Sequence, residues 1–213
     1  MFDAVIFDLD GLLLDTESVA LEAGVEALAQ FGHRVPVSVM AQLIGKDEAT
    51  GAAVLRDYLG VLPDPEALKV EWDAACDRRF AAGIAHRPGV MLLLEALDAL
   101  ALPRAIATSS RMVRAHAKLE WAGLQTRFAT IVSVDCVANP KPAPDPYLRA
   151  ARLLGQDPAR CLAFEDSNTG ALSARRAGLT VVQVPDLQPT DGRYAHLLAP
   201  SLMEGARGIG LLR

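Results

Sequence analysis

The sequence predicts a doubly wound α/β fold, a parallel sheet with helices on both faces, into which an all-helical domain is inserted. Short apolar runs without polar alternation recur along the chain, which is typical of parallel strands buried on both faces. Helical patterns that end at glycine separate most of these runs, and such alternation favours a parallel sheet. Residues 16–85, in contrast, contain only helical patterns.

The elements of the sheet domain follow from these patterns in chain order. The predicted strands are 4–7, 105–107, 130–134, 161–164 and 180–184. The predicted helices are 88–102, 112–122, a segment from Pro146 to Gly155, and 168–177. The patterns assign no structure to the glycine-rich tail after Pro200.

The insert is predicted to hold four helices, at 16–31, 38–44, 47–59 and 65–82. Asp64 can cap the last of these, with Pro65 at its first position. We therefore expect a catalytic α/β core formed by 1–15 and 86–213, and a separate helical domain, 16–85, with its own small core.

Composition narrows the class of protein. The 213 residues carry 26 acidic and 21 basic side chains, a net charge of −5, with no basic run, so nucleic acid is not an expected partner. No apolar stretch approaches the roughly 20 residues that span a membrane, and no signal peptide is visible. Three unpaired cysteines favour a reducing cytoplasm. A monomer is the working expectation, although the sequence does not determine the oligomeric state.

Polar side chains follow several of the predicted strands, at the edge where ligands bind in such sheets. They are Asp8 and Asp10 after the first strand, Thr108, Ser109 and Ser110 after the second, Lys141 in the loop after the third, and Glu165 and Asp166 after the fourth.

Carboxylates gathered in this way repel one another unless a cation lies among them, and an all-oxygen ligand set points to Mg²⁺. Residues two apart in an extended chain face the same side. One aspartate can therefore attack phosphorus while the other reaches the leaving oxygen. Asp8, the first residue after the strand, is the candidate nucleophile, forming an aspartyl phosphate, and Asp10 is the candidate acid and base. Thr108 can donate to a phosphoryl oxygen, which Lys141 can neutralise. Alternatively, the aspartates form a turn, and the hydroxyl residues and Asp166 only cap helices.

The chain resembles the haloacid dehalogenase superfamily of phosphohydrolases, which have a Rossmann-like core and a helical cap domain. Four motifs carry the resemblance: Phe7-Asp8-Leu9-Asp10-Gly11, Ala107-Thr108-Ser109-Ser110, Lys141-Pro142-Ala143-Pro144-Asp145, and Phe164-Glu165-Asp166-Ser167-Asn168-Thr169-Gly170. It implies Asp8 as nucleophile and Asp10 as acid/base. It also implies Mg²⁺ held by Asp8, the Asp10 backbone carbonyl and Asp166, with Glu165 assisting.

Within the superfamily the chain is similar to small phosphatases, β-phosphoglucomutases and pseudouridine-5′-phosphatase-like proteins. Dehalogenases usually lack the second aspartate, so Asp10 favours phosphate chemistry. A Gly45-Lys46 pair in the cap makes Lys46 the candidate cap residue for substrate contact. Pro140 stands where the family usually has glycine, so the loop that carries Lys141 is expected to follow a different path.

The leading hypothesis is a Mg²⁺-dependent phosphatase acting on a small phosphorylated metabolite, a sugar or nucleoside monophosphate. One alternative is a sugar phosphomutase of the β-phosphoglucomutase type. The mutases that the chain resembles commonly have a histidine where this chain has Ala20, which disfavours that alternative. The other alternative is a non-catalytic phosphate-binding regulator, which would have no need for both Asp8 and Asp10.

Overall fold

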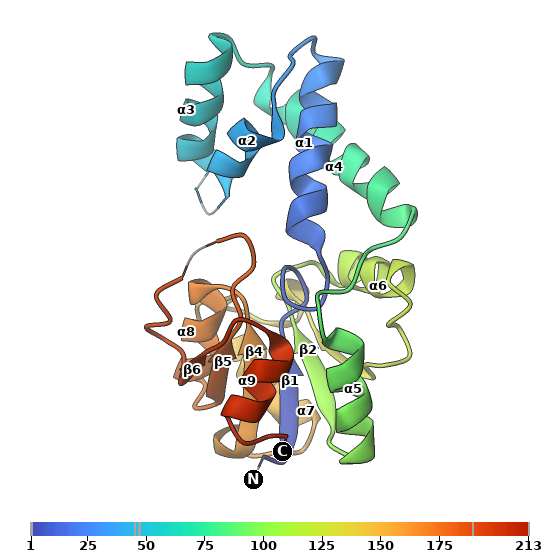
Figure 1. The fold of residues 1–213 in the computed structure, drawn as a ribbon, viewed down its shortest axis with the longest axis vertical. Coiled ribbons are helices and arrows are strands. Elements are labelled where there is room, and N and C mark those ends of the chain that lie inside the picture. The colour runs from blue at the N-terminus through green and yellow to red at the C-terminus, as the bar shows by residue number, and fades with distance from the viewer. Residues whose placement is uncertain (1, 45, 47, 189, 213) are drawn as a thin grey trace. The chain divides into compact units, whose positions relative to one another are not determined.

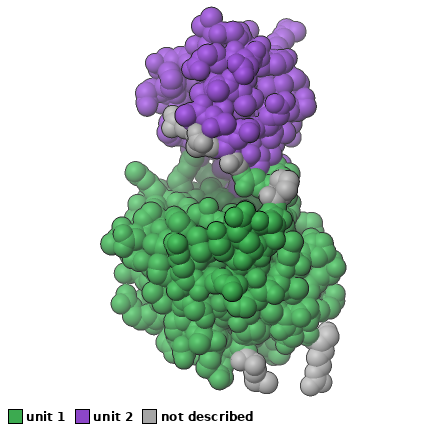
Figure 2. Space-filling view, turned by 90° about the vertical axis from the view of Figure 1, so that its left-hand side faces the viewer, with its two compact units in different colours: residues 1–15, 85–213 green, residues 16–84 purple. Residues whose placement is uncertain are grey.

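The computed structural model describes residues 2–44, 46, 48–188 and 190–212. The chain forms two compact units, which Figure 2 shows in different colours. The core unit comprises residues 1–15 and 85–213, and the helical unit residues 16–84.

The core unit contains one parallel sheet (Figure 1). Within the described residues it has six strands in the order β3-β2-β1-β4-β5-β6. Their bounds are β1 Ala4–Phe7, β2 Arg104–Ala107, β3 Thr130–Val132, β4 Cys161–Glu165, β5 Thr180–Gln183 and β6 Leu197–Leu198. The predicted fold class is confirmed, because central β1 has parallel neighbours on both sides, β2 and β4.

Helices cover both faces of this sheet. They are α5 Val90–Ala99, α6 Met112–Trp121, α7 Asp145–Leu153, α8 Asn168–Arg176 and α9 Leu202–Gly208, with short 3-10 turns η2 Val134–Cys136 and η3 Pro158–Arg160. Ala4 and Ile6 belong to a buried cluster with alanines of α7 and α8. The opposite face includes Phe164, whose ring stacks on Phe7 at 5.5 Å and approaches Gly205 of α9. The strands are thus buried on both faces, as their continuous apolar pattern predicts.

Some predicted bounds were wrong. The third strand ends at Val132, and the chain then forms η2. The fourth strand continues one residue further than predicted, so Glu165 is its last residue and is fully buried. The tail after Pro200 forms α9, and β6 lies just before it. The patterns revealed neither element, because two strand residues and a short glycine-rich helix give no periodic signal.

The helical unit contains α1 Thr16–Gln30, α2 Val37–Met40, η1 Ala41–Leu43, α3 Glu48–Leu59 and α4 Pro65–Ala81. The helix predicted at 38–44 is therefore one α-turn followed by a 3-10 turn. Asp64 caps α4 by accepting from the Ala67 N–H at 2.9 Å, as predicted. Trp72 of α4 donates to the Ala20 carbonyl of α1 at 2.8 Å. The unit has its own apolar cluster of Leu28, Val35, Val39, Met40 and Leu55.

Candidate active site

A pocket of about 180 Å³ lies in the core unit at the carboxyl ends of the strands. It is lined by Asp8, Asp10, Thr108, Ser109, Lys141, Asp166, Ser167, Thr169 and Gly170. Six of these residues were predicted to form the site, and they come from four separate stretches of the chain. The parallel register brings them together, because Phe7 pairs with Phe164 on one side and Ile106 on the other.

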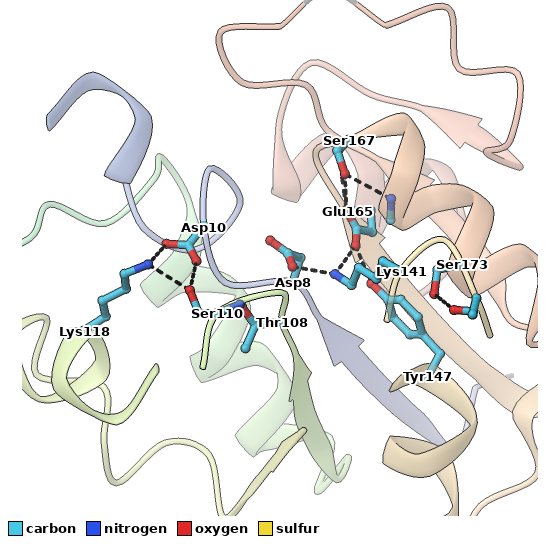
Figure 3. A network of polar contacts seen from close by, with 12 residues as sticks. Asp8, Asp10, Thr108, Ser110, Lys118, Lys141, Tyr147, Glu165, Ser167 and Ser173 are labelled. Carbon is cyan, nitrogen blue, oxygen red and sulfur yellow. Dashed lines mark hydrogen bonds and ion pairs between the residues drawn. The ribbon is translucent and has the colours of Figure 1, made fainter. Parts of the chain in front are cut away.

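Lys141 lines this pocket and lies between Asp8 and Glu165 (Figure 3). Its Nζ donates to Asp8 Oδ1 and to Glu165 Oε1, each at 2.6 Å. Its side chain is only 4% exposed, so both contacts are shielded from water. The loop with Pro140 therefore delivers Lys141 to the site in spite of the departure from the usual glycine.

Burial dominates the electrostatics of these groups. It raises the pKa of the Asp8 carboxyl from its ordinary 3.8 to about 7; Lys141 opposes this shift, and the negative charges of Glu165 and Asp10 add to it. Burial also disfavours the charge on Lys141, but Asp8 and Glu165 outweigh it and hold the pKa of Lys141 above its ordinary value. Lys141 is thus a permanent cation beside Asp8.

Glu165 accepts hydrogen bonds from three residues of the protein among those described. Besides Lys141, the Tyr147 hydroxyl donates to Oε1 at 2.6 Å, and the Ser167 hydroxyl donates to Oε2 at 3.2 Å. Burial raises the pKa of the Tyr147 hydroxyl well above its ordinary value, and the Glu165 charge adds to this effect. Tyr147 was not predicted as a site residue, because a tyrosine within a helix is usually a packing residue.

Three carboxylates form an acidic cluster that could hold a metal ion. One oxygen from each of Asp8, Glu165 and Asp166 lies within 4.8 Å of the others. These are hard oxygen ligands, which suit Mg²⁺. Gly11 is required beside them, since its φ is +77° and a Cβ there would lie 2.6 Å from the Asp166 carboxylate.

Thr108 and Ser110, which follow β2, lie on the other side of Asp8 from Lys141 (Figure 3). Thr108 is 2% exposed, and its Oγ1 accepts the Ser110 N–H at 3.0 Å. The Ser110 hydroxyl donates to Asp10 Oδ2 at 2.8 Å. Thr108 and Ser109 line the pocket, while Ser110 binds the second aspartate.

Lys118 is a second lysine at the site that the sequence analysis missed. It projects from α6, and its Nζ donates to Asp10 Oδ1 at 2.6 Å and to the Ser110 hydroxyl at 3.0 Å. A lysine in an amphipathic helical pattern is normally assigned to the solvent face, so no sequence signal distinguished it.

Lys46, the predicted substrate contact, belongs to the helical unit and is exposed. Its predicted role stays a prediction, and Gly45, the other half of the pair, lies outside the described residues. Two other basic residues of the unit are engaged locally: Arg78 pairs with Glu26 and Glu71, and Arg79 with Glu22 and Glu26.

Comparison with known proteins identifies the family. The family model for haloacid dehalogenase-like hydrolase matches residues 2–178. The fructose-1-phosphate phosphatase YqaB of Escherichia coli is 32% identical over 183 residues, covering 86% of this chain and 96% of YqaB. The phosphorylated carbohydrates phosphatase of Thermotoga maritima is 31% identical over 177 residues, covering 83% and 82% of the two chains.

A solved structure is similar over nearly the whole chain. A haloacid dehalogenase family hydrolase from Deinococcus radiodurans, with bound phosphate and sodium, superimposes with a TM-score of 0.81 at 30% identity and covers 99% of this chain and 97% of its own. No helix among the described residues is long and apolar enough to cross a membrane. Because the family model and both phosphatases match most of the chain, the chain belongs to the haloacid dehalogenase-like hydrolases and is a phosphoric monoester hydrolase.

Proposed function

We propose that this protein hydrolyses a small phosphorylated metabolite, a sugar or nucleoside monophosphate, through an aspartyl phosphate on Asp8. One observation carries the proposal: Asp8 and Asp10 line one pocket, yet each has its own lysine, Lys141 and Lys118 respectively. Different partners suit two carboxylates for different tasks, one as nucleophile and one as acid and base.

In the first half of the reaction, a carboxylate oxygen of Asp8 attacks phosphorus and the bond from phosphorus to the leaving alcohol breaks. Asp10 gives its proton to the departing alcohol oxygen. Thr108 and the backbone N–H groups after β2 bind phosphoryl oxygens at the start of α6. Lys141 stabilises the negative charge that the phosphoryl group and Asp8 share in the transition state.

In the second half, Asp10, now a carboxylate, takes a proton from water as the water oxygen attacks phosphorus. The bond from phosphorus to Asp8 breaks, orthophosphate leaves, and both aspartates return to their first state. Mg²⁺, held by Asp8, Asp166 and the Asp10 backbone carbonyl with Glu165 assisting, would neutralise phosphoryl charge. The relatives from Escherichia coli and Thermotoga maritima are phosphatases of fructose 1-phosphate and of phosphorylated carbohydrates, which supports a sugar phosphate as substrate.

The test is phosphate release, with Mg²⁺, from a panel of sugar and nucleoside monophosphates. We expect at least one sugar phosphate to be hydrolysed and Asp8→Asn to be inactive on it. We propose that the helical unit selects the substrate, and Lys46→Ala should then raise KM more than it lowers kcat. Equal phosphate release by the parent and Asp8→Asn would refute the proposed nucleophile.

A further inference from the structure

Lys118 occupies a position that is costly for a lysine. Lys118 is only 8% exposed, and it lies on a face of α6 on which Ala115 and Leu119 are also buried. Removing an ammonium group from water is unfavourable unless the charge finds good partners. Its partners include Asp10 and Ser110, which with Lys118 form a triangle of hydrogen bonds (Figure 3).

This triangle holds both oxygens of the Asp10 carboxylate. Oδ1 accepts from Lys118 at 2.6 Å and Oδ2 from Ser110 at 2.8 Å. The carboxylate points toward Lys118, while the Asp8 carboxylate lies on the side of Lys141 (Figure 3). The Asp10 carboxylate is also outside the acidic cluster, although it is only two residues from Asp8.

We propose that Lys118 is a positioning residue for the acid/base step. With Ser110, it holds the Asp10 carboxylate at the pocket wall, available to the leaving oxygen and separate from the three carboxylates of the acidic cluster. Without Lys118, the Asp10 side chain, which is 30% exposed, would lose the hydrogen bond that fixes Oδ1, and its carboxylate would turn more freely in the pocket. The inference rests on the proposed role of Asp10.

The test uses two substrates that differ in their need for an acid. A sugar phosphate releases an alkoxide-like oxygen that must be protonated, whereas 4-nitrophenyl phosphate releases a stable phenolate. General acid catalysis contributes about 10²–10⁴-fold. Because a misplaced acid loses only a fraction of that contribution, we expect Lys118→Met to lower kcat/KM for the sugar phosphate by roughly 30-fold, and for 4-nitrophenyl phosphate by less than about 3-fold. Lys118→Arg keeps the charge, so kcat/KM for the sugar phosphate relative to kcat/KM for 4-nitrophenyl phosphate should stay close to that of the parent.

Three further variants complete the design. Lys69→Met removes a lysine that is 67% exposed and paired with Asp73 on α4, and should change neither rate. The ratio that matters is kcat/KM for the sugar phosphate divided by kcat/KM for 4-nitrophenyl phosphate. Asp10→Asn should lower this ratio more than Lys118→Met does. If Lys118→Met does not fold, Ser110→Ala takes its place. This variant removes the hydroxyl that donates to Asp10 Oδ2, and it should also lower the ratio.

The outcomes separate the two proposals. If Asp10→Asn lowers the ratio and Lys118→Met leaves it unchanged, slows both substrates equally or accelerates the sugar phosphate, the role of Lys118 is refuted and that of Asp10 stands. If Asp10→Asn itself leaves the ratio unchanged, the acid/base role of Asp10 fails, and the inference about Lys118 fails with it.

Discussion

Gly170→Ala is the substitution for which the structure makes the sharpest forecast. Gly170 lies in the first turn of α8, where alanine would ordinarily stabilise a helix. Here an added Cβ would lie 1.8, 2.0 and 2.2 Å from Oε1, Cδ and Oε2 of Glu165. Glu165 is fully buried and is held by Lys141 and Tyr147, so its carboxylate cannot move aside without breaking those contacts.

The cost follows from those contacts. A hydrogen bond to a charged group contributes about 1.5–3 kcal/mol, so losing two costs about 3–6 kcal/mol. The better helix propensity of alanine offsets about 1 kcal/mol of this loss in the free energy of unfolding. We expect a net loss of about 3 kcal/mol, which lowers the melting temperature of a chain of this size by about 6–12 °C. Because Lys141 loses a partner, kcat/KM should fall at least about tenfold.

The assay is thermal unfolding together with kcat/KM on the best sugar phosphate. Gly51→Ala in α3 is the matched control, because among the described residues its Cβ would meet only Leu43 Cδ2, at an ordinary 3.8 Å. That helical glycine should gain about 0.5–1 kcal/mol when replaced. If Gly170→Ala were as stable and active as the parent, the Glu165 carboxylate would not be clamped as described.

Further predictions concern the nucleophile and the cation. Asp8→Asn should lower phosphatase activity by more than about 10³-fold while the circular dichroism spectrum stays that of the parent, and activity within tenfold would contradict its role. Because the folded pKa of Asp8, about 7, is above its ordinary 3.8, the metal-free parent should lose stability as pH rises from about 4 to about 7. Melting curves in chelator should show that Asp8→Asn lacks this loss. Chelation should abolish turnover and Ca²⁺ should restore it poorly, because its larger shell disturbs in-line attack; full turnover without metal would refute this. With β-glucose 1-phosphate and a glucose 1,6-bisphosphate primer, free phosphate should form faster than glucose 6-phosphate, and the reverse would identify a mutase.

Much of the fold could be predicted from the sequence, because its signals are local. The apolar run of β1 and the glycines that end α6 and α8 act over a few residues, so they can be identified without knowing the partners. The position of the two aspartates directly after β1 predicted that they belong to the site, since parallel strands present their carboxyl ends at one edge.

The tertiary structure alone decided which charges meet. Lys118 and Asp10 are 108 residues apart, and Tyr147 reaches Glu165 from a helix that looked purely structural. Gly170, one member of a motif, was seen to be required only when the carboxylate beside it was in place. Periodicity shows which face of a helix is apolar, but it does not show which side chain of another element that face will meet. Such contacts depend on strand register, helix rotation and side-chain rotamers, and these are set when the whole core packs.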